Sequence, residues 1–332
     1  MNLIRAEVGR LTARRFVQVM VLLLIGAFGI TIATTIAGSH APTGPELARA
    51  EAQAAETRLD AERWYADCLA AQRSAEPSDL REKYPRDCDD LRPARIDAAD
   101  FLYGVFVFDR QIRPLVYFLV TFLALFGFLV GASYIGADLN SGGMTNLLLW
   151  RPSRLTVLGG KLGTLLAGVL LVSLVAAVLY LGAFWTIAQV GGLPGNTDGE
   201  FWGWLALTVG RGFALILMTT AAGFAIATLG GHTAAALGTV AGYAVLWEAG
   251  ARIVMEIVEA ARPDQWMLST YVITWMTGET SLWDQRACRG AVDVDCTGAY
   301  TITWVPAALV LLAVTAGAVG TAFAVFRRRD LA

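Results

Sequence analysis

The sequence predicts an all-α polytopic membrane protein with six transmembrane helices. The 332 residues are 56% hydrophobic and only 16% charged, whereas a soluble domain carries about 25% charged residues. Long apolar runs, of the length that crosses a bilayer, alternate with a few polar blocks that hold most of the charges. The short segments 1–15, 137–161 and 327–329 are rich in Arg or Lys. Because such segments stay on the cytoplasmic side, both termini are expected there.

The first basic segment, 1–15, combines four arginines with a partial apolar stripe. Two interpretations are open: an interfacial helix on the cytoplasmic leaflet, or a basic segment that only orients the first span. Residues 16–37 form that span, since about 20 apolar residues cross the hydrocarbon core. The run ends without the small-residue pattern of a signal-peptide cleavage site, so we expect it to be retained.

Residues 38–113 are rich in Ala, Glu, Asp and Arg, which favours a small helical extracytoplasmic domain between the first and second spans. All four cysteines lie in polar blocks predicted to be outside, where an oxidising compartment allows disulfides. The pairs nearest in sequence are Cys68 with Cys88, and Cys288 with Cys296, although spacing leaves other pairings open. The first pair would tie together two arms of this domain.

The remaining apolar runs complete the six spans. In the second span, Gly127 and Gly131 form a small-xxx-small pair that permits close approach of another helix. In the extracytoplasmic loop 259–300, the apolar stretch WMLSTYVITWMTG is too short to span, so we expect short re-entrant or interfacial helices. The predicted bounds are 114–136 for the second span, 162–258 for the third to fifth spans, and 301–332 for the sixth span with the basic C-terminus.

Charged residues also occur within the outer halves of two predicted spans. Arg211 lies about two turns inside the fourth span, where it must snorkel, pair or face a cavity. Glu248, Arg252 and Glu256 are each four residues apart, on one face of the fifth span. This ladder either lines the outer part of a substrate path or only steadies the helix end by mutual pairing. Arg211 would be able to complete the same network.

The most specific motif is the basic loop 137–161, ADLNSGGMTNLLLWRPSRLTVLGGK. Met144, Leu147 and Leu148 fall at i, i+3 and i+4, which predicts a short helix with one apolar stripe. Pro152 ends that helix, because it has no N–H to donate and its ring clashes with the preceding turn. The loop is therefore expected to hold a short cytoplasmic helix, rigidly joined to spanning helices on both sides.

This loop resembles the one between the second and third spans of type-2 ABC exporter (ABC-2 type) permeases. In that family an acidic residue and small residues precede a helix, followed by Leu, Pro-Ser-Arg and Gly-Lys. The family more commonly has Glu at the acidic position and Gly-Thr at the small pair. The resemblance covers nearly the whole chain, and relatives from high-GC Gram-positive bacteria are similar in their large outer domain. The matching residues are Asp138, Gly142, Gly143, Leu147, Leu148, Pro152, Ser153, Arg154, Gly160 and Lys161.

The resemblance implies a plasma-membrane permease that exports an amphiphilic drug, lipid or peptide. It also implies a second permease chain, identical or different, and two separate ATPase subunits that hold ATP and Mg. The apolar stripe of the loop would bind an ATPase while the surrounding charges steer it. An amphipathic loop resting on lipid headgroups is the alternative. The predicted coupling residues are Asp138, Met144, Leu147, Leu148, Trp150, Arg151 and Arg154.

The sequence offers no catalytic or metal-binding constellation. Gly159-Gly160-Lys161 is similar to the end of a phosphate loop, but Leu162 stands where Ser or Thr must hold magnesium. We therefore expect no cofactor in this chain. No basic stripe with interleaved aromatics indicates a nucleic-acid partner. The rival function is a membrane scaffold or sensor, whose Cys-linked outer domain binds a ligand or an envelope protein without transport.

Overall fold

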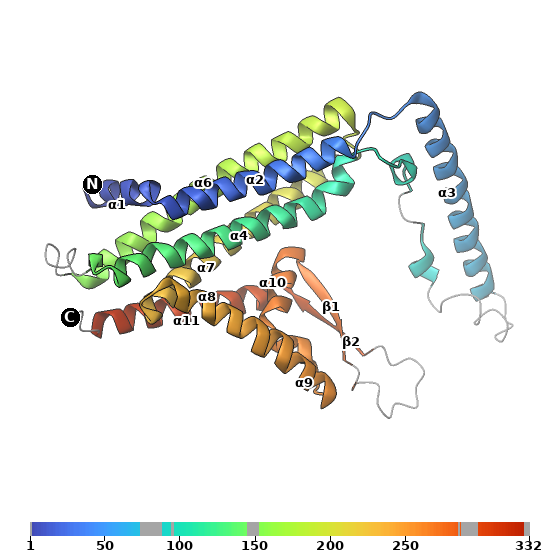
Figure 1. Ribbon diagram of the computed structural model, residues 1–332. Helices are drawn as coiled ribbons and strands as arrows, with labels where there is room; N and C mark the ends of the chain where they lie inside the picture. The colour runs from blue at the N-terminus through green and yellow to red at the C-terminus, as the bar shows by residue number, and fades with distance from the viewer. Residues whose placement is uncertain are drawn as a thin grey trace. The chain divides into compact units, whose positions relative to one another are not determined.

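The computed structural model describes residues 2–73, 88–93, 96–144, 153–284, 286 and 298–328, which are mainly long helices (Figure 1). Within this part of the chain, five helices are long and apolar enough to cross a membrane. They correspond to every predicted span except the fifth. Their bounds are Arg15–Ala37 (α2), Phe108–Asn140 (α4), Arg154–Gly191 (α6), Gly199–Gly230 (α7) and Trp304–Arg328 (α11).

The predicted fifth span is helical throughout, but it is divided into three segments. These are α8 (Thr233–Gly242), the π-helical segment η3 (Tyr243–Ala251) and α9 (Arg252–Ile257). Each segment alone is too short to cross a bilayer, so the count of six spans stays a prediction. A π-helical interruption is rare and is often associated with a functional site.

The chain forms two compact units, and the first of them contains most of the long helices. In this unit α2, α4 and α6 lie side by side (Figure 1). The ring of Phe28 on α2 lies 6.2 Å from that of Phe118 on α4 and 4.8 Å from that of Tyr180 on α6. The first unit comprises Met1–Gly29, Pro114–Tyr180 and Gly199–Ala332, and the second comprises Ile30–Arg113 and Leu181–Asp198.

Helices α4 and α7 approach closely at the predicted small-xxx-small pair. A Cβ at residue 131 would lie 2.5 Å from the backbone oxygen of Thr220, and a Cβ at residue 127 would overlap the hydroxyl of the same threonine. From the other side, Gly223 of α7 faces the carbonyl of Phe128 so closely that a Cβ there would overlap it. The spacing of Gly127 and Gly131 therefore predicts a real helix contact.

The segment that follows α9 contains strands as well as helices. After the 3-10 turn η4 (Pro263–Trp266), the apolar stretch forms α10 (Leu268–Thr277), which packs on α7 and α11. Strands β1 (Glu279–Trp283) and β2 (Ala299–Thr303) then pair in antiparallel fashion. The all-α prediction misses this pair: β1 lies in the predicted loop 259–300, and β2 crosses the predicted boundary between that loop and the sixth span at residue 301. The alternating Tyr, Ile and Thr residues of β2 favour a strand instead.

The second unit contains the predicted polar helix, α3 (Gly44–Arg73). The backbone N–H and the hydroxyl of Thr43 donate to a carboxylate oxygen of Glu46 at 2.8 and 2.9 Å, so the third helical residue satisfies the N–H of the residue before the helix, as in one half of a capping box. The backbone bond from Thr43 is the main reason why the pKa of Glu46 lies below its ordinary value. These local bonds explain why the helix begins at this point.

A disulfide joins Cys68 of α3 to Cys88, the first residue of the 3-10 turn η1 (Cys88–Leu91). This is the first of the two predicted pairs. The second, Cys288 with Cys296, lies outside the described residues and stays a prediction. A second link within the unit runs from Nη2 of Arg58 to the carbonyl of Ile96, at 2.7 Å. This bond and the disulfide hold Ile96 and Cys88 close to α3.

Candidate functional site

The N-terminal helix α1 (Asn2–Ala13) packs against α6 through one of its faces. Glu7 and Leu11, which are four residues apart, are only 1% and 7% exposed. A methyl carbon of Leu11 lies 2.8 Å from the position that a Cβ at Gly168 would take, so the helices cross where α6 has no side chain. Neither interpretation of residues 1–15 included this protein contact.

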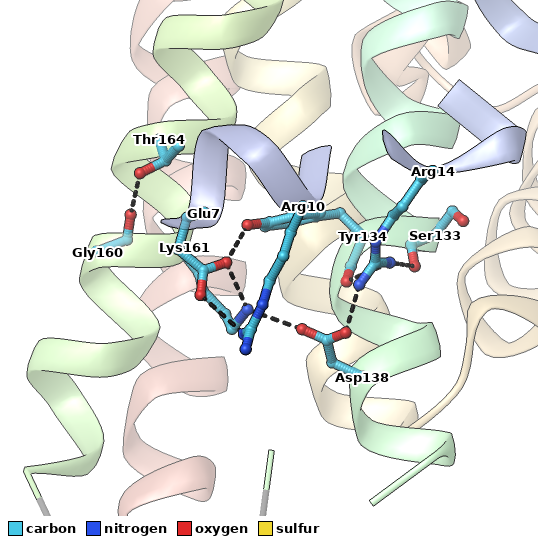
Figure 2. Close-up of polar contacts among 9 residues, drawn as sticks. All are labelled: Glu7, Arg10, Arg14, Ser133, Tyr134, Asp138, Gly160, Lys161 and Thr164. Atoms are coloured by element: carbon cyan, nitrogen blue, oxygen red, sulfur yellow. Dashed lines mark hydrogen bonds and ion pairs between the residues drawn. The ribbon is translucent and has the colours of Figure 1, made fainter. Parts of the chain in front are cut away.

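Lys161 is the centre of a buried charge cluster, defined by Glu7, Arg14, Tyr134, Asp138 and Lys161 (Figure 2). Its Nζ lies 2.7 Å from a carboxylate oxygen of Glu7 and 2.7 Å from one of Asp138. The hydroxyl of Tyr134 donates to the Glu7 oxygen that Lys161 contacts. One lysine of α6 thus holds α1 and α4 together.

Arg14, the residue between α1 and α2, completes the buried charge cluster (Figure 2). Its guanidinium forms an ion pair with Asp138 and donates to the carbonyls of Ser133 and Tyr134, at 3.2 and 2.9 Å. It also lies 4.9 Å from the centre of the Tyr134 ring, and Nζ of Lys161 lies 5.0 Å from the same centre. Tyr134 therefore contacts both cations through its ring and one anion through its hydroxyl.

The buried charge cluster is electrically balanced, with two carboxylates and two cationic side chains. Removing one partner from a buried ion pair costs about 3–5 kcal/mol, because the other charge stays behind unpaired. Arg10 also pairs with Glu7, at 3.2 Å, but its side chain is 51% exposed. An exposed pair of this kind contributes about 0–1 kcal/mol. The inner contact to Lys161, not the outer one to Arg10, therefore holds Glu7 in place.

The buried charge cluster joins the two ends of the predicted coupling loop, 137–161. Asp138 comes two residues before the end of α4 at Asn140, and Lys161 lies in the second turn of α6, which begins at Arg154. Both helices that flank residues 141–153 are thus fixed to α1 and to each other. Asp138, the single acid of the sequence motif, is therefore in direct contact with Lys161 of its Gly-Lys pair.

The structure places two of the predicted coupling residues in contacts within the chain. Asp138 is one of the anions of the buried charge cluster, and Met144 is only 1% exposed. Their role in coupling to an ATPase stays a prediction. Arg154 donates to the carbonyl of Arg327, at 3.4 Å. The other predicted coupling residues, Leu147, Leu148, Trp150 and Arg151, lie outside the described residues.

The predicted ladder of charges forms only in part. Arg252 pairs with Glu256 at 3.3 Å, and also with Asp264 at 3.2 Å. Glu248 instead accepts hydrogen bonds from the backbone N–H and the hydroxyl of Ser269, at 3.0 and 2.7 Å, and from the hydroxyl of Tyr243, at 2.8 Å. The mutual pairing of Glu248 with Arg252 is therefore wrong, because the start of α10 supplies nearer donors.

Arg252 and Glu256 face a pocket of about 330 Å³. Its wall combines charged residues with the apolar Met255 and Trp283. Arg211, which was expected to extend the ladder, lies against two tryptophan rings, of α10 and α11. It thus belongs to a different contact. The remaining residues of the pocket are Glu259, Ala260, Pro263, Asp264 and Arg286.

The buried charge cluster was not predicted from the sequence, although isolated charged residues indicated it. Glu7 is the sole acid before Glu46, and Asp138 is the sole acid of the loop 137–161. Lys161 is one of only two lysines in the chain. Isolated acids within basic segments need partners if they are buried. The pairing itself follows from tertiary packing, which brings positions 7 and 161 together.

A comparison with known families gives a match over nearly the whole chain. A family described as ABC-2 family transporter protein matches residues 1–331. The chain belongs to the ABC-2 transporter family. No curated protein and no solved structure matches it. As an ABC-2 family member with several long apolar helices, it is a multi-pass membrane protein.

Proposed function

We propose that this chain is the membrane-spanning subunit of an ATP-driven exporter in the plasma membrane, with both termini cytoplasmic. The observation that carries the proposal is the buried charge cluster beside the loop 141–153. In this ABC-2 chain it joins three helices next to the loop on which an ATPase partner would exert force. The transported molecule would be an amphiphilic drug, lipid or peptide. ATP and Mg would be bound by the partner ATPase.

The buried charge cluster would pass a displacement of the loop to three helices together. The loop follows α4 directly and precedes α6 directly, so a force on it acts on both helix ends. Asp138 on α4 and Lys161 on α6 are joined at 2.7 Å, and the same lysine holds Glu7 of α1. Buried ion pairs have fixed geometry and resist separation in a medium of low dielectric constant. Binding of ATP and closure of the ATPases would therefore move α1, α4 and α6 as one body.

The assembly would contain two permease chains, identical or different, and two ATPase subunits. The loop would dock in a cleft of the ATPase, with Leu147 and Leu148 at the centre of the contact and Trp150, Arg151 and Arg154 around it. Membrane lipid would surround the spans. The alternative for the loop is contact with lipid headgroups, which also suits Arg and Trp.

The proposal is tested by co-expression with ABC ATPase subunits, followed by copurification and by measurement of ATP turnover linked to transport. Leu148→Ala should weaken ATPase association by more than about 1 kcal/mol if the residue is a central contact. Leu59→Ala, on the exposed surface of α3, is the matched control. Under lipid contact alone, Leu148→Ala should leave the complex intact.

A charge reversal tests the rim of the same contact. Arg154→Glu should uncouple ATP turnover from transport or release the ATPase, while the chain still inserts. Arg49→Glu, at an exposed position of α3, is the matched control. If Leu148→Ala and Arg154→Glu both keep full assembly and full transport-linked ATP turnover, the coupling role of the loop is wrong.

A second candidate function, a membrane scaffold or sensor, has support from the disulfide between Cys68 and Cys88. This bond holds a long polar helix in a defined form, as a ligand-binding domain requires. The same copurification distinguishes the two functions. A chain that associates with no ATPase, but binds an envelope protein through α3, would be the scaffold.

A further inference from the structure

Arg211 of α7 lies against the rings of two tryptophans from other helices. Its guanidinium carbon is 5.9 Å from the centre of the Trp275 ring on α10 and 5.9 Å from that of Trp304, the first residue of α11. The two rings lie 6.4 Å apart. The indole N–H of Trp275 donates to the carbonyl of Arg211 at 2.9 Å, which fixes this ring beside the side chain.

The guanidinium of Arg211 has no anionic partner among the residues that the structure describes. No carboxylate in that part of the chain lies within 4.0 Å of it, and its five N–H donors make no hydrogen bond there. Cation–π contacts with the rings contribute about 0.5–2 kcal/mol each, but they leave the in-plane donors unused. An arginine in a spanning helix needs an acceptor, a counter-charge or a water-filled space. Arg14 and Arg252 of the same chain both have such partners.

A glycine lies directly beside the guanidinium of Arg211. Gly278, which ends α10, has φ +98°, and a Cβ at this position would lie 3.1 Å from Nη1 of Arg211. Any larger residue would thus crowd the donors. Trp304 is 47% exposed, so the site is reached from the surface of the unit. The guanidinium of Arg211 and the two indole rings together form this site.

We propose that Arg211, Trp275 and Trp304 bind the anionic headgroup of an amphiphile, that is, a phosphate or a carboxylate attached to an apolar tail. The planar fork of arginine matches the oxygens of either group in two-point contact. Tryptophan rings suit the boundary between headgroup and tail. The source of the headgroup is either a bilayer phospholipid or the transported molecule. The proposal rests on the export function proposed above and adds the charge of the amphiphile. Binding of the amphiphile is measured separately from transport.

The test uses the full chain in maltoside micelles and two probes with the same tail. Dodecyl phosphate carries an anionic headgroup and dodecyltrimethylammonium a cationic one, and native mass spectrometry counts the bound probe. We expect one molecule of dodecyl phosphate to bind wild type at least about tenfold more tightly than Arg211→Gln, as loss of a charge-assisted hydrogen bond predicts. Arg211→Lys should fall between them, and Arg63→Gln, which changes an arginine of α3 that is already paired with Asp60, should bind as wild type does.

Equal binding of dodecyl phosphate by wild type and Arg211→Gln would overturn the proposal. Equal binding of the two probes by wild type would overturn it as well, and this comparison needs no variant that must fold. Protein extracted without added probe separates the two sources. A phospholipid that is retained by wild type and lost from Arg211→Gln identifies a lipid site, whereas ATP-dependent transport of dodecyl phosphate identifies a substrate site. Binding without any transport supports the site and counts against export instead.

Discussion

Nζ of Lys161 lies 2.7 Å from a carboxylate oxygen of Glu7, although 154 residues separate them in the chain. Both side chains are only 1% exposed. The contact therefore places two full charges in the interior of the first unit, where each depends on the other. It also fixes an N-terminal helix to the beginning of α6, so that α1 becomes part of the membrane unit.

Lys161→Met should destabilise the chain by about 3–5 kcal/mol, because it leaves Glu7 and Asp138 buried with one cation fewer. Arg10→Gln removes the exposed partner of the same carboxylate and should cost at most about 1 kcal/mol. Thermal unfolding of the detergent-solubilised protein measures both. The double variant Glu7→Gln, Lys161→Met removes one charge of each sign and should recover part of the loss. Equal melting temperatures for Lys161→Met and Arg10→Gln would contradict a structural role for the inner pair.

Much of this site was outside the reach of sequence reasoning. Hydropathy located the spanning helices, because each must bury about 20 apolar residues in lipid, whatever its neighbours are. The Gly127 and Gly131 spacing located the α4 contact, since close packing requires small residues at that interval. The partners of Lys161 and Glu248 are set by tertiary packing between distant segments. Periodicity within one helix suggested Arg252 for Glu248, whereas the fold supplies Ser269.

Gly131→Ala should destabilise the contact of α4 with α7 by about 1–3 kcal/mol, because its Cβ would lie 2.5 Å from the backbone oxygen of Thr220. Gly317→Ala on α11, where a Cβ would meet nothing within 4 Å, is the matched control. It should be neutral or stabilising by up to about 1 kcal/mol, since alanine favours a helix more than glycine does. Thermal unfolding compares the two. Stabilisation by both alanines would show that α4 and α7 are not in close contact.

Cys68→Ser should destabilise the second unit by about 3 kcal/mol, as expected for a bond that closes a loop of this size. Its two cysteines are 20 residues apart in the sequence. The measurement is the rate at which a protease cleaves α3, followed by mass spectrometry. Cys88→Ser should have the same effect, and so should reductant acting on wild type. If reductant leaves the cleavage rate unchanged, the disulfide does not hold this unit together.

The orientation of the chain is tested with an impermeant thiol reagent on intact cells. A cysteine introduced at Thr197 should react from outside. One introduced at Ser153 should react only after permeabilisation, because the basic segments are expected to stay in the cytoplasm. Labelling of the native Cys288 and Cys296 is measured on the chain that carries neither introduced cysteine. The reverse labelling pattern would overturn the predicted topology.

Glu248 connects the π-helical segment η3 to the start of α10. It accepts from the N–H and the hydroxyl of Ser269, and Tyr243 of the same segment accepts from the N–H of Leu268 at 3.1 Å. These N–H groups belong to the first turn of α10 and have no partner within that helix. A carboxylate at this position also suits the positive end of the helix dipole. Glu248 therefore acts as the N-terminal cap of α10.

Glu248→Ala should cost about 1.5–3 kcal/mol, the range for hydrogen bonds to a charged group, and should speed hydrogen exchange at Leu268 and Ser269. Glu248→Gln keeps one acceptor oxygen and should cost less. Glu256→Gln, at an exposed carboxylate that pairs with Arg252, is the control and should leave exchange at α10 unchanged. Arg252→Gln separates the two interpretations of the outer charges: lower transport per folded molecule indicates a substrate path, and lower stability with intact transport indicates a structural pair. A capping role for Glu248 is wrong if Glu248→Ala leaves amide exchange at Leu268 and Ser269 as slow as in wild type.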